Sequence, residues 1–207
     1  MFVMVTGGNF GRNLKSNINI RKKFMSQKNV EIKARCKNIY EVINYLDSSE
    51  DFEKKGIDLQ RDTYYNIING TRLKMREGNI ENALVSYKRD DEFGPKDSNI
   101  VLHHFDNDRK SEEIIYNLKE ILNHSLGVLV IVNKKRHIYW NSTNAVKIHV
   151  DTIEGLGNFV EIEVMDLTHN RDQLEMIETC DFYIDKFELD DFIDKSYSDM
   201  ILEQKKM

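Results

Sequence analysis

The chain has 207 residues, and its 30 Lys and Arg residues against 35 Asp and Glu residues give a formal net charge of -5 at pH 7. This length fits one domain, and a hydrophobic content of 40% with 10% aromatic residues supplies a core and excludes wholesale disorder. The acidic balance argues against a general nucleic-acid-binding protein, which normally carries a basic excess, so no nucleic-acid partner is expected.

The first 28 residues differ in composition from the rest of the chain. No Asp or Glu precedes Glu31, whereas basic residues, glycines and asparagines are frequent. Because no clear amphipathic helix can be drawn through residues 1–28, we expect a disordered extension, followed by a single domain at residues 29–207. A mitochondrial presequence, which is also basic and poor in acidic residues, is the alternative interpretation.

Residues 29–35 begin the periodic part of the chain. Apolar and charged residues alternate there, which predicts a strand with one apolar and one charged face. Asn38 is in position to cap a short helix that extends to Leu46. A polar loop is expected over residues 47–56.

The strongest turn signal is Asn69-Gly70, which separates residues 64–68 from residues 71–76. Asn-Gly accepts the positive phi angles of a type I′ turn, so this segment predicts a β-hairpin. Further strands are expected at residues 83–89, 100–105, 126–133, 136–141, 144–150 and 159–166, and further helices at residues 111–124, 171–179 and 189–202.

Many strands with short turns and few helices favour a mainly antiparallel sheet that closes or nearly closes. The longest apolar run, residues 126–132, is too short to cross a bilayer, so no membrane partner is expected. Cys36 and Cys180 lie far apart and show neither a zinc-site spacing nor a disulfide framework. A reducing, cytoplasmic location therefore fits best.

Charged residues occupy alternate positions on five segments. The groups are Glu31/Lys33/Arg35, Arg72/Lys74/Arg76, Lys134/Arg136, Lys147/His149/Asp151 and Glu161/Glu163. An ordinary antiparallel sheet with one wetted face shows the same alternation, and an interaction protein of that kind is one interpretation. However, two groups are wholly basic and one is wholly acidic, whereas a surface sheet usually mixes charges across neighbouring strands. The alternative is that these faces turn inward and line a polar cavity.

Inward-facing charges of this kind suit a polyanion and a metal ion. Several Lys and Arg side chains match a ligand with several phosphate groups. The carboxylates of Glu31, Glu161 and Glu163 offer hard oxygen ligands for Mg²⁺ or Mn²⁺. Together they form a set of groups suited to phosphoryl transfer.

Several motifs in order along the chain resemble those of one family. They are Asn29-Val30-Glu31-Ile32-Lys33-Ala34-Arg35, Asp62-Thr63-Tyr64-Tyr65, Thr71-Arg72-Leu73-Lys74-Met75-Arg76, Gly94-Pro95-Lys96-Asp97-Ser98, Lys147-Ile148-His149-Val150-Asp151 and Gly155-Leu156-Gly157-Asn158-Phe159-Val160-Glu161-Ile162-Glu163. The sequence is similar to the CYTH family of triphosphate tunnel metalloenzymes, which includes class IV adenylyl cyclases and thiamine triphosphatases. The likeness extends over about residues 29–202.

The resemblance implies an α+β fold, in which an eight-stranded antiparallel β-barrel with flanking helices, closed or nearly closed, encloses a charged tunnel. It implies metal ligands at Glu31, Glu161 and Glu163, with Asp151 either a further ligand or a group that orients a basic neighbour. Phosphate-binding residues would be Lys33, Lys74, Arg76, Lys134, Arg136 and Lys147, with Arg35 and Arg72 as weaker candidates and Lys88 or Arg89 in an ambiguous register. The catalytic set would be Glu31, Lys33, Glu161 and Glu163.

One position departs from the family pattern, because Asn29 stands where the first Glu would be. An amide supplies no charge and should weaken a metal site. The leading hypothesis is therefore a metal-dependent hydrolase of a small triphosphate, such as ATP, thiamine triphosphate or inorganic triphosphate. Cyclisation of ATP to cyclic AMP is the first alternative, and a non-catalytic phosphate-binding module is the second. The family resemblance also makes a homodimer an expectation.

Overall fold

The computed structural model describes residues 29–68, 70–88, 100–143, 145–168 and 170–206. The predicted extension at residues 1–28, Arg89 and the motif at residues 94–98 lie outside this part of the chain.

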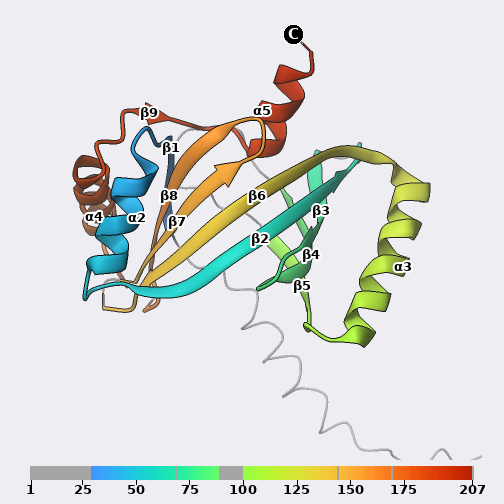
Figure 1. Ribbon diagram of the computed structural model, residues 1–207, viewed down its shortest axis with the longest axis horizontal. Helices are drawn as coiled ribbons and strands as arrows, with labels where there is room; N and C mark the ends of the chain where they lie inside the picture. The colour runs from blue at the N-terminus through green and yellow to red at the C-terminus, as the bar shows by residue number, and fades with distance from the viewer. Residues whose placement is uncertain (1–28, 69, 89–99, 144, 169, 207) are drawn as a thin grey trace, which may run out of the picture.

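One antiparallel sheet organises the described residues (Figure 1). Its spatial order is β5-β4-β3-β2-β6-β7-β8-β1-β9. The strands are β1 (Asn29–Arg35), β2 (Glu53–Tyr65), β3 (Thr71–Glu77), β4 (Asn82–Lys88), β5 (Ile100–Phe105), β6 (Val128–Asn141), β7 (Val146–Ile153), β8 (Gly157–Met165) and β9 (Asp191–Phe192). The fold is α+β, and the strongly curved sheet forms a nearly closed barrel, although hydrogen bonds do not join its two outer strands within the described residues.

The hairpin predicted around Asn69-Gly70 is confirmed. Strands β2 and β3 pair antiparallel, with Tyr64 opposite Lys74, and Gly70 has a phi angle of +74°. Only a residue that tolerates a left-handed backbone fits at such a phi angle, and glycine does so without steric cost.

Two predicted breaks in the strands are wrong. Strand β2 begins at Glu53, inside the expected polar loop, and β6 runs unbroken where two strands were expected. In both places charged residues interrupt the apolar pattern but keep a period of two. In β6, Lys134 and Arg136 are buried while Lys135 between them is exposed, so the charged run is a strand with a polar inner face.

Four helices complete the described residues: α2 (Ile39–Ser48), α3 (Arg109–Leu126), α4 (Gln173–Lys186) and α5 (Tyr197–Gln204). The helix expected over residues 189–202 is the main error. Its first part forms β9, which pairs with the end of β1, and Ser196 then starts α5 through a capping box with Asp199.

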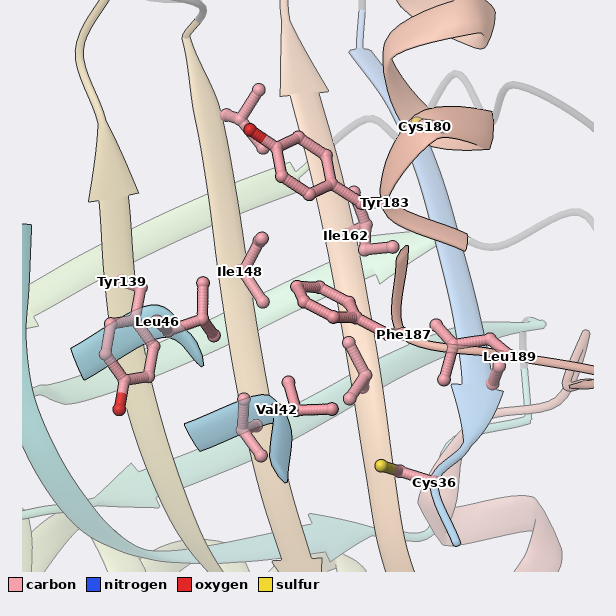
Figure 2. Close-up of a cluster of buried hydrophobic side chains, with 14 of the residues drawn as sticks. Cys36, Val42, Leu46, Tyr139, Ile148, Ile162, Cys180, Tyr183, Phe187 and Leu189 are labelled. Carbon is pink, nitrogen blue, oxygen red and sulfur yellow. The ribbon is translucent and has the colours of Figure 1, made fainter. Parts of the chain in front are cut away.

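The largest apolar cluster lies between the convex face of the sheet and the helices α2 and α4. Figure 2 shows Val42 and Leu46 of α2 directed at Ile148 and Ile162 of the sheet, with Tyr183 of α4 beside them. A second cluster packs α5 against β6 and β8, and a third lies under α3. Because α2, α4 and α3 cover the outer, apolar faces of their strands, the alternate, charged residues point to the inside of the barrel. Helix α5 instead packs on apolar residues of that inner face, such as Val132 and Phe159.

Within the described residues, no helix is both long enough and apolar enough to cross a membrane.

Candidate functional site

A polar cavity of about 530 Å³ lies on the inner face of the sheet. Three of its cations come from different strands: Arg76 from β3, Arg136 from β6 and Lys147 from β7. The other lining residues are Lys55, Gln60, Ile80, Glu81, Asn82, His104, Phe105, Ile138 and His149. The structure therefore gathers basic groups that are distant in the sequence around one hollow.

A single buried carboxylate holds three cations in the barrel wall. Asp62 of β2 accepts from Lys74 Nζ at 2.7 Å, from Arg76 Nε at 2.9 Å and Nη2 at 3.1 Å, and from Lys134 Nζ at 3.4 Å. Burial raises the pKa of Asp62, but the three cations outweigh burial and hold that pKa well below its usual range. Asp62 is thus a fixed counter-ion for the basic groups.

Arg76 also pairs with Glu81 at 2.6 Å, so Lys74 and Lys134 depend most on Asp62. Burial, followed by the charge of Arg136, lowers the pKa of Lys134 to about 7. Burial also lowers the pKa of Lys74, despite its contact with Asp62. Burial and the neighbouring cations thus disfavour the charged form of Lys134, and an anionic ligand nearby would favour it.

Arg136 is held by a bidentate ion pair with Asp151. Nε donates to Oδ1 at 2.7 Å and Nη2 donates to Oδ2 at 2.6 Å. The hydroxyl of Tyr197, the first residue of α5, donates to the same Oδ2 at 2.9 Å. Both oxygens of Asp151 are occupied, which favours its expected role as an orienting group over that of a metal ligand.

The candidate metal ligands lie on neighbouring strands β1 and β8. Glu31 is directly opposite Glu163, and Glu161 is two residues from Glu163 on the same face. Glu161 contacts Lys33 at 3.6 Å, Arg136 at 3.5 Å and His149 at 3.2 Å. Burial raises the pKa of Glu161, but Arg136, Lys33 and His149 outweigh burial and hold it well below the usual range.

The carboxylate oxygens of Glu31, Glu161 and Glu163 are suitable ligands for a divalent cation, although the three side chains do not converge on one point. Two carboxylates directly opposite each other destabilise a sheet unless a cation lies between them, and Glu31 and Glu163 are such a pair. Glu163 is instead turned to Lys147 at 3.1 Å. Among the described residues no group of three or more His, Cys, Asp or Glu side chains is arranged to hold a metal ion.

The CYTH domain model matches residues 27–182 of the chain. The chain belongs to the CYTH domain family. Proteins of this family bind triphosphates and depend on metal ions. No curated protein matches the sequence.

Solved structures show the same fold. The PH1012 protein of Pyrococcus horikoshii OT3 superposes with a TM-score of 0.62 and 21% identity, over 83% of this chain and 98% of that chain. A "putative adenylate cyclase" of Vibrio parahaemolyticus superposes with a TM-score of 0.60 and 19% identity, over 86% of this chain and 99% of that chain. A Bacillus halodurans protein, also named a "putative adenylate cyclase", superposes with a TM-score of 0.52 and 14% identity, over 84% of this chain and 97% of that chain.

The two weaker phosphate-binding candidates, Arg72 and Arg35, bind other groups of the protein outside the cavity. Arg72 contacts Asp199 at 2.8 Å and donates to the Ser196 hydroxyl at 2.5 Å, both near α5. Arg35 donates to the carbonyl of Leu156 at 2.8 Å. Neither residue lines the cavity of about 530 Å³.

The ambiguous register of Lys88 is resolved by the pairing of β3 with β4. Lys88 lies opposite Thr71, whereas the inward-facing Arg72 lies opposite Tyr87. Directly paired residues share a face. Lys88 therefore lies on the outer face and is not a phosphate-binding candidate, and Arg89 lies outside the described residues.

Sequence reasoning assigned no role to two inward-facing residues of β2, Gln60 and Asp62, although Asp62 opens one of the family motifs. Gln60 lines the cavity and Asp62 is the shared counter-ion. The available signal was the alternation of polar residues at positions 58, 60 and 62 of this CYTH strand. The predicted hairpin strand begins only at residue 64, so these positions fall outside it.

Proposed function

We propose that this CYTH protein is a metal-dependent enzyme that binds a triphosphate in the barrel cavity and hydrolyses it. The observation that carries the proposal is the convergence of Arg76, Arg136 and Lys147 on one cavity. Such a set of cations on three strands matches a chain of phosphate groups better than it matches a single charge.

The basic residues would neutralise and orient the phosphates. Arg136 is held in place by Asp151, and Arg76 by Asp62, so neither guanidinium needs to reorganise when a ligand binds. Preorganised donors of this kind stabilise the charge that develops during phosphoryl transfer. Lys33, Lys74 and Lys134 lie behind them as buried cations that add to the positive potential.

Glu31, Glu161 and Glu163 are the residues that would hold Mg²⁺ or Mn²⁺. When bound, the ion would polarise the phosphoryl group and help to position a water for in-line attack. To bind the ion, Glu163 would have to break its ion pair with Lys147. Lys147 would then be available to pair with the phosphates. Asn29 adds no charge at the end of the same strand.

Cyclisation of ATP is the alternative activity, because the same cavity could bind ATP with a ribose hydroxyl as the nucleophile. The structural similarity to the Vibrio parahaemolyticus protein named as an adenylate cyclase supports this alternative. A phosphate-binding module without turnover is the second alternative. For all three we propose a cytoplasmic protein that acts on a small molecule.

Release of phosphate and of cyclic nucleotide from ATP, thiamine triphosphate and inorganic triphosphate, with Mg²⁺ and with Mn²⁺, separates the three. Hydrolysis gives phosphate, cyclisation gives cyclic AMP and pyrophosphate, and a binding module gives neither. Glu161→Gln should abolish turnover while the fold remains, and the exposed Glu175→Gln is the matched control. An unaffected Glu161→Gln enzyme would refute the proposed ligand set.

A further inference from the structure

Gln60 is a lining residue of the cavity, and its side-chain amide is buried. Gln60 is only 4% exposed, and its Oε1 has no hydrogen-bond partner among the described residues. Leaving a buried carbonyl oxygen without a donor is costly, so such a group in a ligand cavity indicates a donor on the ligand.

The orientation of this amide is fixed by chemistry. Gln60 Nε2 donates to Asp58 Oδ2 at 2.6 Å, and an ionised carboxylate can only accept. Asp58 is itself anchored, because its Oδ1 accepts from the Ile80 N–H at 2.9 Å. Gly78 packs against the same carboxylate so closely that a Cβ there would lie 2.6 Å from Oδ1. The amide therefore cannot turn its nitrogen to the cavity.

The surroundings of Gln60 favour a ligand that has an organic part as well as phosphate groups. Phosphate oxygens are acceptors and cannot satisfy Oε1, so the cations of the cavity leave this atom unpaired even when phosphate is bound. The side chains of Ile80 and Ile138 add an apolar part to the cavity. Inorganic triphosphate has no group that would use either feature.

On the basis of the proposed function, we propose that Gln60 is a specificity-determining residue that selects an organic triphosphate. Its Oε1 accepts a hydrogen bond from an N–H or O–H group on the organic part of the ligand. That organic part packs on Ile80 and Ile138, while the phosphates lie against the cations.

The test compares dissociation constants for inorganic triphosphate, ATP and thiamine triphosphate, measured by calorimetry in EDTA so that no turnover occurs. Gln60→Met keeps the shape and removes the acceptor. It should weaken binding of at least one of the two organic ligands about 10-fold and leave inorganic triphosphate unchanged. Gln204→Met makes the same change on the exposed end of α5 and should alter neither the affinity for the organic ligands nor that for inorganic triphosphate.

A second variant should make Gln60 present a donor to the cavity in place of an acceptor. In Asp58→Asn the amide oxygen must face the Ile80 N–H, so the amide nitrogen faces Gln60. Gln60 then turns its oxygen to that nitrogen and presents its own NH₂ to the cavity. The affinity for the organic ligand should fall, while the affinity for inorganic triphosphate should rise, because phosphate oxygens accept from the NH₂ group.

The outcomes separate this inference from the proposed function. If no triphosphate binds the wild-type protein, the proposed function fails. If the triphosphates bind but Gln60→Met weakens all of them equally, or none, the role of Gln60 is overturned. An unchanged ligand preference in a folded Asp58→Asn protein would also overturn it.

Discussion

The hydroxyl of Tyr197 lies 2.9 Å from Oδ2 of Asp151, and this hydrogen bond connects the last helix to the group that positions Arg136. The Tyr197 ring also lies under the ammonium of Lys33, with 4.7 Å from Nζ to the ring centroid. Helix α5 is therefore part of the wall of the charged interior.

Tyr197→Phe tests this connection. Removing the hydroxyl leaves one acceptor site of buried Asp151 unsatisfied, so the free energy of unfolding should fall by about 1–3 kcal/mol. Urea denaturation followed by circular dichroism measures it. Tyr40→Phe, at a side chain that is 79% exposed, should change stability little. Equal stability of the two variants would contradict a structural role for the Tyr197 hydroxyl.

Asp62→Asn tests the shared counter-ion. Lys74, Arg76 and Lys134 would lose their common carboxylate, and uncompensated buried charge should cost about 3–5 kcal/mol of stability. Inorganic triphosphate should then raise the melting temperature of the variant more than that of the wild type, because it replaces the lost anion.

The exposed Asp185→Asn is the control for this experiment and should match the wild type. If triphosphate stabilised Asp62→Asn no more than the wild type, the cations held by Asp62 would not belong to the ligand site.

Lys134 predicts a pH dependence of triphosphate binding. With a pKa of about 7 in the free protein, Lys134 loses its proton as the pH rises through neutrality. A bound polyanion favours the charged form, so binding takes up a proton and the affinity should fall between about pH 6 and pH 8. Calorimetry in buffers of different ionisation enthalpy measures the proton uptake.

Lys134→Arg isolates this effect from the titration of the ligand itself. Arginine stays protonated throughout this range, so the proton uptake at that position should disappear and the affinity should be less sensitive to pH. The same proton uptake in Lys134→Arg as in the wild type would contradict the assignment to Lys134.

Much of the fold could be predicted, because a period of two reports which residues share a strand face. The inward direction of Lys74, Arg76, Lys134 and Arg136 followed from that alternation together with the family motifs. The ion pairs could not be predicted, since Asp62 and Lys134 are 72 residues apart and their contact depends on strand order. The start of helix α5 could not be predicted, because the capping residue Ser196 lies in a run of polar residues that offers several possible caps.

The most direct test of the central claim is calorimetric titration of inorganic triphosphate into the wild-type protein and Lys147→Met, in EDTA. Lys147 lines the cavity and forms a half-exposed ion pair with Glu163 at 3.1 Å, so its removal should leave the fold intact. We predict saturable binding that is at least about 10-fold weaker in Lys147→Met and unchanged in the exposed Lys110→Met control. Absence of binding by the wild type, or equal affinity in Lys147→Met, would contradict a triphosphate site in this cavity.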